Sequence, residues 1–123
     1  MEYMLLIYVE GEPDSATDEQ REQLGAAFGK YTQELIDAGA MVGGDQLAPP
    51  TAATTVRSQG GDTLTTDGPF AETHEWLAGY YKIEVDSVDE AIEWAGRIPS
   101  LQGGGSIEAR PVVPSPAPQP SNT

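Results

Sequence analysis

The segment Tyr3–Val9 constrains the fold most, because it is an uninterrupted run of seven residues with large, mostly apolar side chains. In a β-strand, Tyr3, Leu5, Ile7 and Val9 would face one side and the residues between them the other. A strand that is apolar on both faces belongs in the centre of a sheet that is covered on both sides. One cover can come from helices of the same chain. A partner subunit is the obvious second cover, so the run predicts a homodimer.

Two segments carry helix signals. Thr17-Asp18-Glu19-Gln20 has the pattern of a capping box, and Gly39 is suited to end the helix that follows. Its apolar stripe comprises Leu24, Phe28, Tyr31, Leu35 and Ala38. Gly25 and Gly29 interrupt this helix, and we expect them to allow close approach to a sheet. Ser87-Val88-Asp89-Glu90 is a second capping-box pattern, before a helix that stops ahead of Pro99. The second stripe comprises Ala91, Ile92, Ala95 and Ile98, with Trp94 at its border.

The remaining strands complete a recognisable order. Ala40–Gly44 predicts a short strand, and Asp45–Pro50 a loop. Thr54–Ser58 and Asp62–Thr66 flank Gln59-Gly60-Gly61 and predict a β-hairpin. Further strands are expected at Leu77–Val85, with Leu77, Gly79 and Tyr81 on one face, and at Ser106–Arg110. The order β-α-β, hairpin, β-α-β predicts an α+β fold of the ferredoxin-like, split βαβ type with an inserted hairpin.

Composition limits the organisation and the partners. The length allows one domain, expected over residues 1–112, while the proline-rich residues 113–123 predict a flexible tail. Twenty acidic against six basic residues give a net charge of −14, which disfavours nucleic acid and anionic membranes. The chain has no cysteine, which excludes disulfides and thiolate chemistry, and its single histidine excludes a multi-histidine metal site. With no apparent targeting or membrane segment, we expect a cytoplasmic location.

One motif combines turn formers with titratable groups: Asp67-Gly68-Pro69-Phe70-Ala71-Glu72-Thr73-His74-Glu75. The run resembles the signature of DGPF-domain proteins, a branch of the YCII-related family. The resemblance extends to Tyr3-Met4-Leu5-Leu6-Ile7-Tyr8, Gly79-Tyr80-Tyr81 and Glu108-Ala109-Arg110-Pro111-Val112, and so covers residues 1 to about 112. It implies a ferredoxin-like fold that pairs into a dimeric α+β barrel. Most members have no established reaction, and many DGPF-like proteins are encoded beside extracytoplasmic-function sigma factors.

The signature supplies the candidate catalytic residues, Asp67 and His74. Asp67 can accept backbone N–H bonds in the turn, or act as a general base at a pocket mouth. A histidine can act as an acid or a base under physiological conditions, and the resemblance implies that His74 stands where the family usually has lysine. Phe70 is either a buried anchor or a stacking platform. Glu72 and Glu75 are either solvated or ligand-binding.

Three further ligand-binding candidates lie outside the signature: Asp45, Arg57 and Tyr80. Some YCII-type relatives have a proposed histidine–aspartate dyad, with the histidine near the first helix. This chain has no histidine between Thr17 and Gly39, so the dyad does not transfer, although Asp45 falls near the aspartate. Arg57 and Arg110 are either partners of structural carboxylates or ligand clamps. Tyr80 and Tyr81 point to opposite faces, so one can present its hydroxyl to a pocket.

Three functions fit these observations. The first is a cofactor-free enzyme, or enzyme-like protein, acting on a compact polar or aromatic metabolite under the Asp67–Glu75 turn. The second is a small-molecule binding or accessory module without turnover, linked to sigma-factor-controlled transcription. The third is a structural dimer whose signature loop serves only the fold. No cofactor is expected, because nucleotide and phosphate-binding motifs are missing from the sequence.

Overall fold

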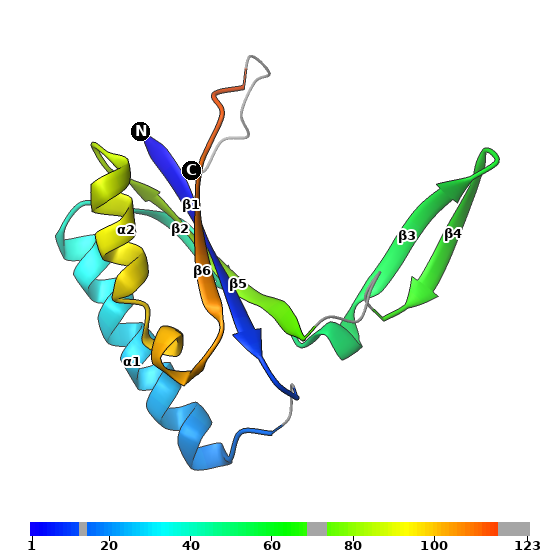
Figure 1. Cartoon of the computed structure of the whole chain (residues 1–123), viewed down its shortest axis with the longest axis horizontal. Helices are drawn as coiled ribbons and strands as arrows, with labels where there is room; N and C mark the ends of the chain where they lie inside the picture. The colour runs from blue at the N-terminus through cyan, green and yellow to red at the C-terminus, as the bar shows by residue number, and fades with distance from the viewer. Residues whose placement is uncertain (13–14, 69–73, 116–123) are drawn as a thin grey trace.

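The structure, a computed structural model, describes residues 1–12, 15–68 and 74–115. Four strands, β1 (Glu2–Glu10), β2 (Met41–Gln46), β5 (Glu75–Glu84) and β6 (Ser106–Pro111), form one antiparallel sheet in the order β2-β5-β1-β6. Helices α1 (Asp18–Asp37) and α2 (Val88–Gly96) lie together on one side of this sheet (Figure 1). Short 3-10 helices follow at Pro50–Ala52 and Pro99–Gly103. The fold is α+β and ferredoxin-like, as predicted.

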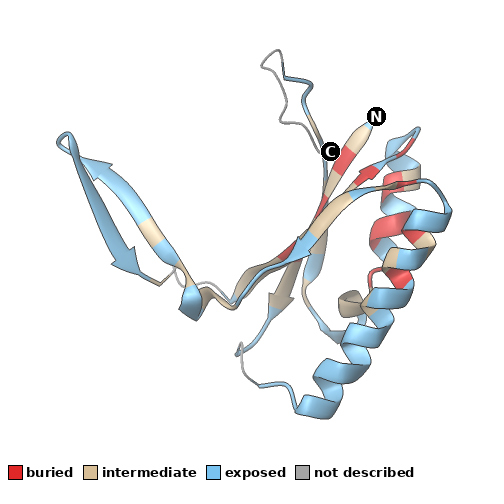
Figure 2. Cartoon of the chain, turned by 180° about the vertical axis from the view of Figure 1, so that it is seen from behind, coloured by how far each residue is buried: buried red, intermediate tan, exposed pale blue. Residues whose placement is uncertain are grey.

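The pairing of β1 with β5 forms the centre of the core. Leu5 lies opposite Tyr81, and Tyr3 lies opposite Ile83, with all four side chains buried. Leu35 of α1 and Ala91 of α2 are fully buried in the same cluster. Alternate residues of β1 are only half-buried, because the helices cover one face of the sheet alone (Figure 2). The central position predicted for this strand is confirmed.

Helix α1 begins with the predicted capping box. The Thr17 hydroxyl accepts from the Gln20 backbone N–H at 3.1 Å, and the Gln20 side chain accepts from the Thr17 N–H at 2.9 Å. Gly39 follows the helix with φ +71°, a left-handed conformation that glycine adopts without strain. Only the second half of α1 packs on the sheet, so the expectation of a continuous apolar stripe is wrong at Leu24, which is 42% exposed.

Three other details of the helices differ from prediction. A Cβ at Gly25 or Gly29 would meet nothing within 4 Å, so close approach to the sheet does not explain either glycine. In α2 the Ser87 hydroxyl accepts from the Glu90 N–H, but the Glu90 carboxylate accepts from the Asp86 N–H instead of completing the box. Ala91, Ala95 and Ile98 of the predicted stripe are buried, but Ile92 is 57% exposed and Trp94 is buried in its place.

Tyr31 links both helices to the sheet. Its ring meets Tyr81 and Trp94 edge to face, with ring centroids 5.2 and 5.9 Å away, and its hydroxyl donates to the Trp94 carbonyl at 2.7 Å. Burial, reinforced by the neighbouring Tyr81, raises the pKa of Tyr31 well above its usual range. The buried phenol therefore holds its proton more tightly than it would in the unfolded chain.

The predicted hairpin is confirmed, and it stands apart from the body. Strands β3 (Thr54–Gln59) and β4 (Asp62–Asp67) pair only with each other, around Gly60 and Gly61, which have φ of +58° and +88°. Figure 1 shows this hairpin projecting from the side of the sheet opposite the helices. We refer to residues 54–67 as the arm.

The face of the sheet turned away from the helices is amphipathic. Met4, Leu6 and Tyr8 lie on it and are half-buried within a single copy. A register shift after Ile7 places Leu77 opposite Tyr8. Because directly opposed residues share a face, Leu77 also lies here, and the prediction that it shares a face with Gly79 and Tyr81 is wrong. We refer to this surface as the uncovered face.

The ends of the chain add two observations. Val112 donates its N–H to the Glu2 carbonyl, and Val113 is 83% exposed, while most of the predicted tail lies outside the described residues. The domain limits therefore stay a prediction. Within the part of the chain that the structure describes, neither helix has the length and apolar character needed to cross a bilayer.

We predict that Tyr31→Phe lowers the free energy of unfolding by about 1 kcal/mol at neutral pH, because it removes one buried hydrogen bond. In the wild type the folded-state pKa of Tyr31 is raised, so its contribution is complete below the unfolded value of about 10 and declines as pH rises above it. Urea unfolding from pH 8 to 11 should show that the free energy of unfolding falls less steeply with pH in Tyr31→Phe than in the wild type. Identical pH slopes in both proteins would contradict this assignment.

Candidate functional site

A hydrogen-bonded pair on the uncovered face brings two predicted ligand-binding residues together. Asp45 lies directly opposite Tyr80 in the pairing of β2 with β5, and the Tyr80 hydroxyl donates to Asp45 Oδ2 at 2.8 Å. The prediction that Asp45 lies in a loop is wrong, because β2 continues to Gln46. Tyr81, the next residue, faces the helices, and its hydroxyl shares a 2.7 Å hydrogen bond with that of Thr32. The expected opposition of the two tyrosines is confirmed.

Two glycines frame this pair. A Cβ at Gly44 would lie 2.8 Å from the Tyr80 carbonyl oxygen, and a Cβ at Gly79 would lie 2.8 Å from the Asp45 carbonyl oxygen. Contacts this short are not tolerated, so only glycine at both positions lets β2 and β5 approach so closely. A bulge at Val42 sets the same register, since Met41 pairs with Ile83 and Gly43 with Lys82.

The chemistry of the pair is that of a hydrogen-bond acceptor. The hydrogen bond to Asp45, with the nearby carboxylate charge, raises the pKa of Tyr80 above its ordinary value of 10.0. The phenol therefore stays protonated at neutral pH and donates to Oδ2. The second carboxylate oxygen and the phenolic lone pairs remain able to accept hydrogen bonds from a ligand.

A second polar group lies at the end of the sheet where the signature turn joins β5. Glu10 pairs with Glu75 across β1 and β5, and the Ser106 hydroxyl donates to Glu75 Oε2 at 3.3 Å. The His74 Nε2 atom is 3.8 Å from Glu10 Oε2. The His74 side chain is 82% exposed, so this contact contributes little to stability and the ring is open to solvent.

Asp67, another candidate of the signature, lies at the base of the arm. Asp67 is exposed at the end of β4, opposite Thr54. The adjoining corner is held by Gly68, whose N–H donates to the Ala53 carbonyl at 2.6 Å and whose carbonyl accepts from the Thr55 hydroxyl at 2.8 Å. Phe70 and Glu72 lie outside the described residues, so the catalytic roles expected of Asp67 and His74 stay predictions.

The two arginines lie in different environments. Arg57 is exposed on β3, opposite Leu64, and belongs to the arm. Arg110 on β6 forms an ion pair with Glu108 of the same strand, which fits the structural alternative for that residue. Neither arginine belongs to the pair formed by Asp45 and Tyr80.

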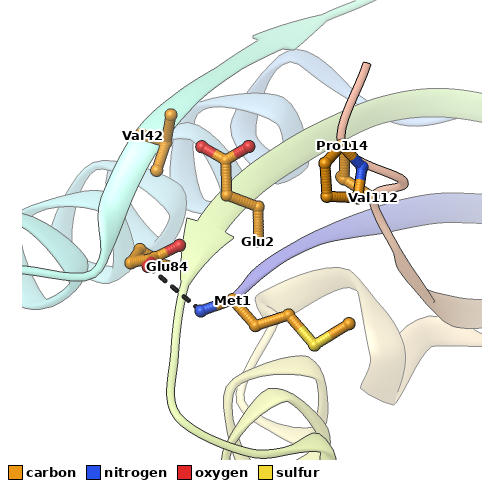
Figure 3. A pocket seen from close by; sticks show the side chains of 6 residues that line it. All are labelled: Met1, Glu2, Val42, Glu84, Val112 and Pro114. Carbon is orange, nitrogen blue, oxygen red and sulfur yellow. Dashed lines mark hydrogen bonds and ion pairs between the residues drawn. The ribbon is translucent and has the colours of Figure 1, made fainter. Parts of the chain in front are cut away.

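A hollow of about 460 Å³ lies near the chain termini rather than beside the predicted residues. Figure 3 shows the Met1 ammonium group bonded to Glu84 in its wall, at 3.0 Å. The residues that line it are Met1, Glu2, Val42, Glu84, Val112 and Pro114. None of the predicted site residues contributes to it, so the hollow does not unite them.

Sequence reasoning missed four residues of these two groups: Gly44, Gly79, Glu10 and Ser106. The glycines matter only through the approach of two backbones that are distant in sequence. Pairing β1 with β5 in register would have suggested Glu10, because it places Glu10 opposite Glu75. Among residues 1–12, 15–68 and 74–115, no three histidine, aspartate or glutamate side chains are grouped to hold a metal ion.

The sheet order, the two helices on one face and the hydrogen-bonded site on the other define a ferredoxin-like α+β protein. The model of the YCII-related domain matches residues 1–116, and the chain belongs to the YCII-related family. It is also 36% identical over 115 residues to an uncharacterised protein of Rhizobium meliloti (strain 1021), an alignment that covers 92% of this chain and 93% of the relative.

We predict that Gly44→Ala lowers the free energy of unfolding by about 1–3 kcal/mol, because its methyl group would push β2 away from the Tyr80 carbonyl. Gly43→Ala is the matched control, since a Cβ at the preceding residue would meet nothing within 4 Å. Urea melts of both variants measure the difference. Equal stability of the two variants would show that the close approach is not needed.

Proposed function

We propose that this protein binds a compact polar or aromatic metabolite on the uncovered face, at the pair formed by Tyr80 and Asp45. The observation that carries the proposal is a fixed phenol–carboxylate pair beside the apolar side chains of Met4, Leu6 and Tyr8. Small-molecule sites commonly combine an apolar lining with a few oriented polar groups. His74 and Glu75, at the end of the sheet where β5 begins, would line the approach to this site.

The charges favour a ligand that donates hydrogen bonds. A carboxylate accepts hydrogen bonds but cannot donate them, and Asp45 belongs to a chain with a net charge of −14. A neutral or cationic ligand with an amine or amide group therefore suits the site better than a carboxylate or phosphate. Binding of this kind needs no cofactor and leaves open whether turnover follows.

The same face supports a homodimer. Met4, Leu6, Tyr8 and Leu77 offer an apolar centre on β1 and β5, which a second copy would cover. Asp45 lies on the edge strand β2, so its pair with Tyr80 would sit at the rim of the two joined faces, where a ligand can still enter. A second copy would thus complete the wall of the binding site.

We predict that Tyr80→Phe abolishes the thermal-shift response to amine- or amide-bearing metabolites, while Tyr81→Phe retains it. The two variants are matched, because each loses one hydroxyl hydrogen bond from adjacent residues on opposite faces of β5. A library that pairs amines with the corresponding carboxylic acids tests the charge preference. Ligand responses lost equally in both variants, or confined to the acids, would contradict the proposed site.

We also predict that light scattering at micromolar concentration gives twice the mass of 13.1 kDa. Leu6→Glu should shift the protein toward the monomer, because it places a charge in the centre of the uncovered face. Its side chain is only half-buried within one copy, so the fold should survive, as far-UV circular dichroism can check. A wild-type mass of one chain would refute the dimer.

A further inference from the structure

Within the described residues 1–12, 15–68 and 74–115, the arm pairs with no strand of the four-stranded sheet. All but one of the residues of β3 and β4 are exposed. A two-stranded hairpin is marginally stable in water unless it packs on another element. Val56, on β3, is 61% exposed. The arm therefore has the character of a segment that docks on another molecule.

The uncovered face indicates a second copy of this chain as that molecule. Met4, Leu6, Tyr8 and Leu77 leave an apolar surface on β1 and β5 that a second copy can cover. The arm and the uncovered face lie on the same side of the body, so a copy seated on that face would be within reach of the arm (Figure 1).

The charges on the arm identify the face that would make the contact. Because opposed residues share a face, Val56 and Thr65 lie on the same side as Ser58 and Thr63, and the centre of that side is uncharged. Leu64 lies on the other side with Arg57 and Asp62. Two copies that each carry a charge of −14 repel one another, so an uncharged surface is the part best suited to close contact.

We propose that the arm of each copy packs its Val56 face against the other copy, so that the two arms clasp the dimer. The inference rests on the proposed pairing of the uncovered faces and extends it: the arm is an interaction element rather than a connector to the signature turn.

Val56→Asp, Leu64→Asp and Ile92→Asp test this proposal together, by analytical ultracentrifugation over a dilution series. Val56→Asp should raise the dimer dissociation constant at least tenfold. Ile92, on α2, is 57% exposed and is the control outside the arm, while Leu64 is the control on the opposite face of the arm. Both control variants should dimerise within about threefold of the wild type. Hydrogen exchange of amides 54–67 in the wild type should slow as rising protein concentration increases the fraction of dimer.

The outcomes separate the possible failures. A dimer that is insensitive to Val56→Asp, with arm amides that exchange rapidly at every concentration, would overturn the clasp and leave the pairing of the uncovered faces standing. An effect of Leu64→Asp equal to that of Val56→Asp would overturn the assignment of the face. A monomeric wild type would overturn the clasp and the dimer together. Ligand responses at Tyr80 are measured separately, and their loss alone would not contradict the proposal that the arms clasp the dimer.

Discussion

The antiparallel pairing of β1 with β5 is the interaction on which the rest of the structure depends. It presents Tyr3, Leu5 and Ile7 to the helices and leaves Met4, Leu6 and Tyr8 on the opposite side. Because strand side chains alternate, burying one set necessarily displays the other. The body of a single copy is thus complete on one face and open on the other. The site and the proposed contacts with a second copy all follow from this asymmetry.

The polar groups on the open side differ in how firmly they are held. Tyr80 and Asp45 are joined directly, in a register that Gly44 and Gly79 permit, and both belong to strands of the main sheet. His74, by contrast, lies at the solvent-exposed start of β5, 3.8 Å from Glu10. Sites that work by orientation need rigid support. The phenol–carboxylate pair has that support, which is why we centre the proposed function on it rather than on the signature turn.

The sequence predicts the family and the fold correctly, but it predicts the candidate site only in part. The signature residues and the strand around Tyr80 pointed to the YCII-related family, and the family match over residues 1–116 confirms it. The sequence indicates both Asp45 and Tyr80 as candidates, but it does not predict their direct hydrogen bond, because it predicts a loop at Asp45. The bulge at Val42 and the glycine contacts that extend β2 involve residues some 35 positions apart, beyond the range of any local pattern.

The sequence by itself determined the elements whose causes are local. The cap at Thr17, the turn at Gly60 and Gly61, and the alternation in β1 depend on neighbouring residues, so short-range rules predict them. Only the tertiary structure decided which half of α1 is buried, on which face Leu77 lies and that the hairpin leaves the sheet. Each of these features depends on strand register and on where one element ends against another. Contacts between residues that are far apart in the sequence decide both.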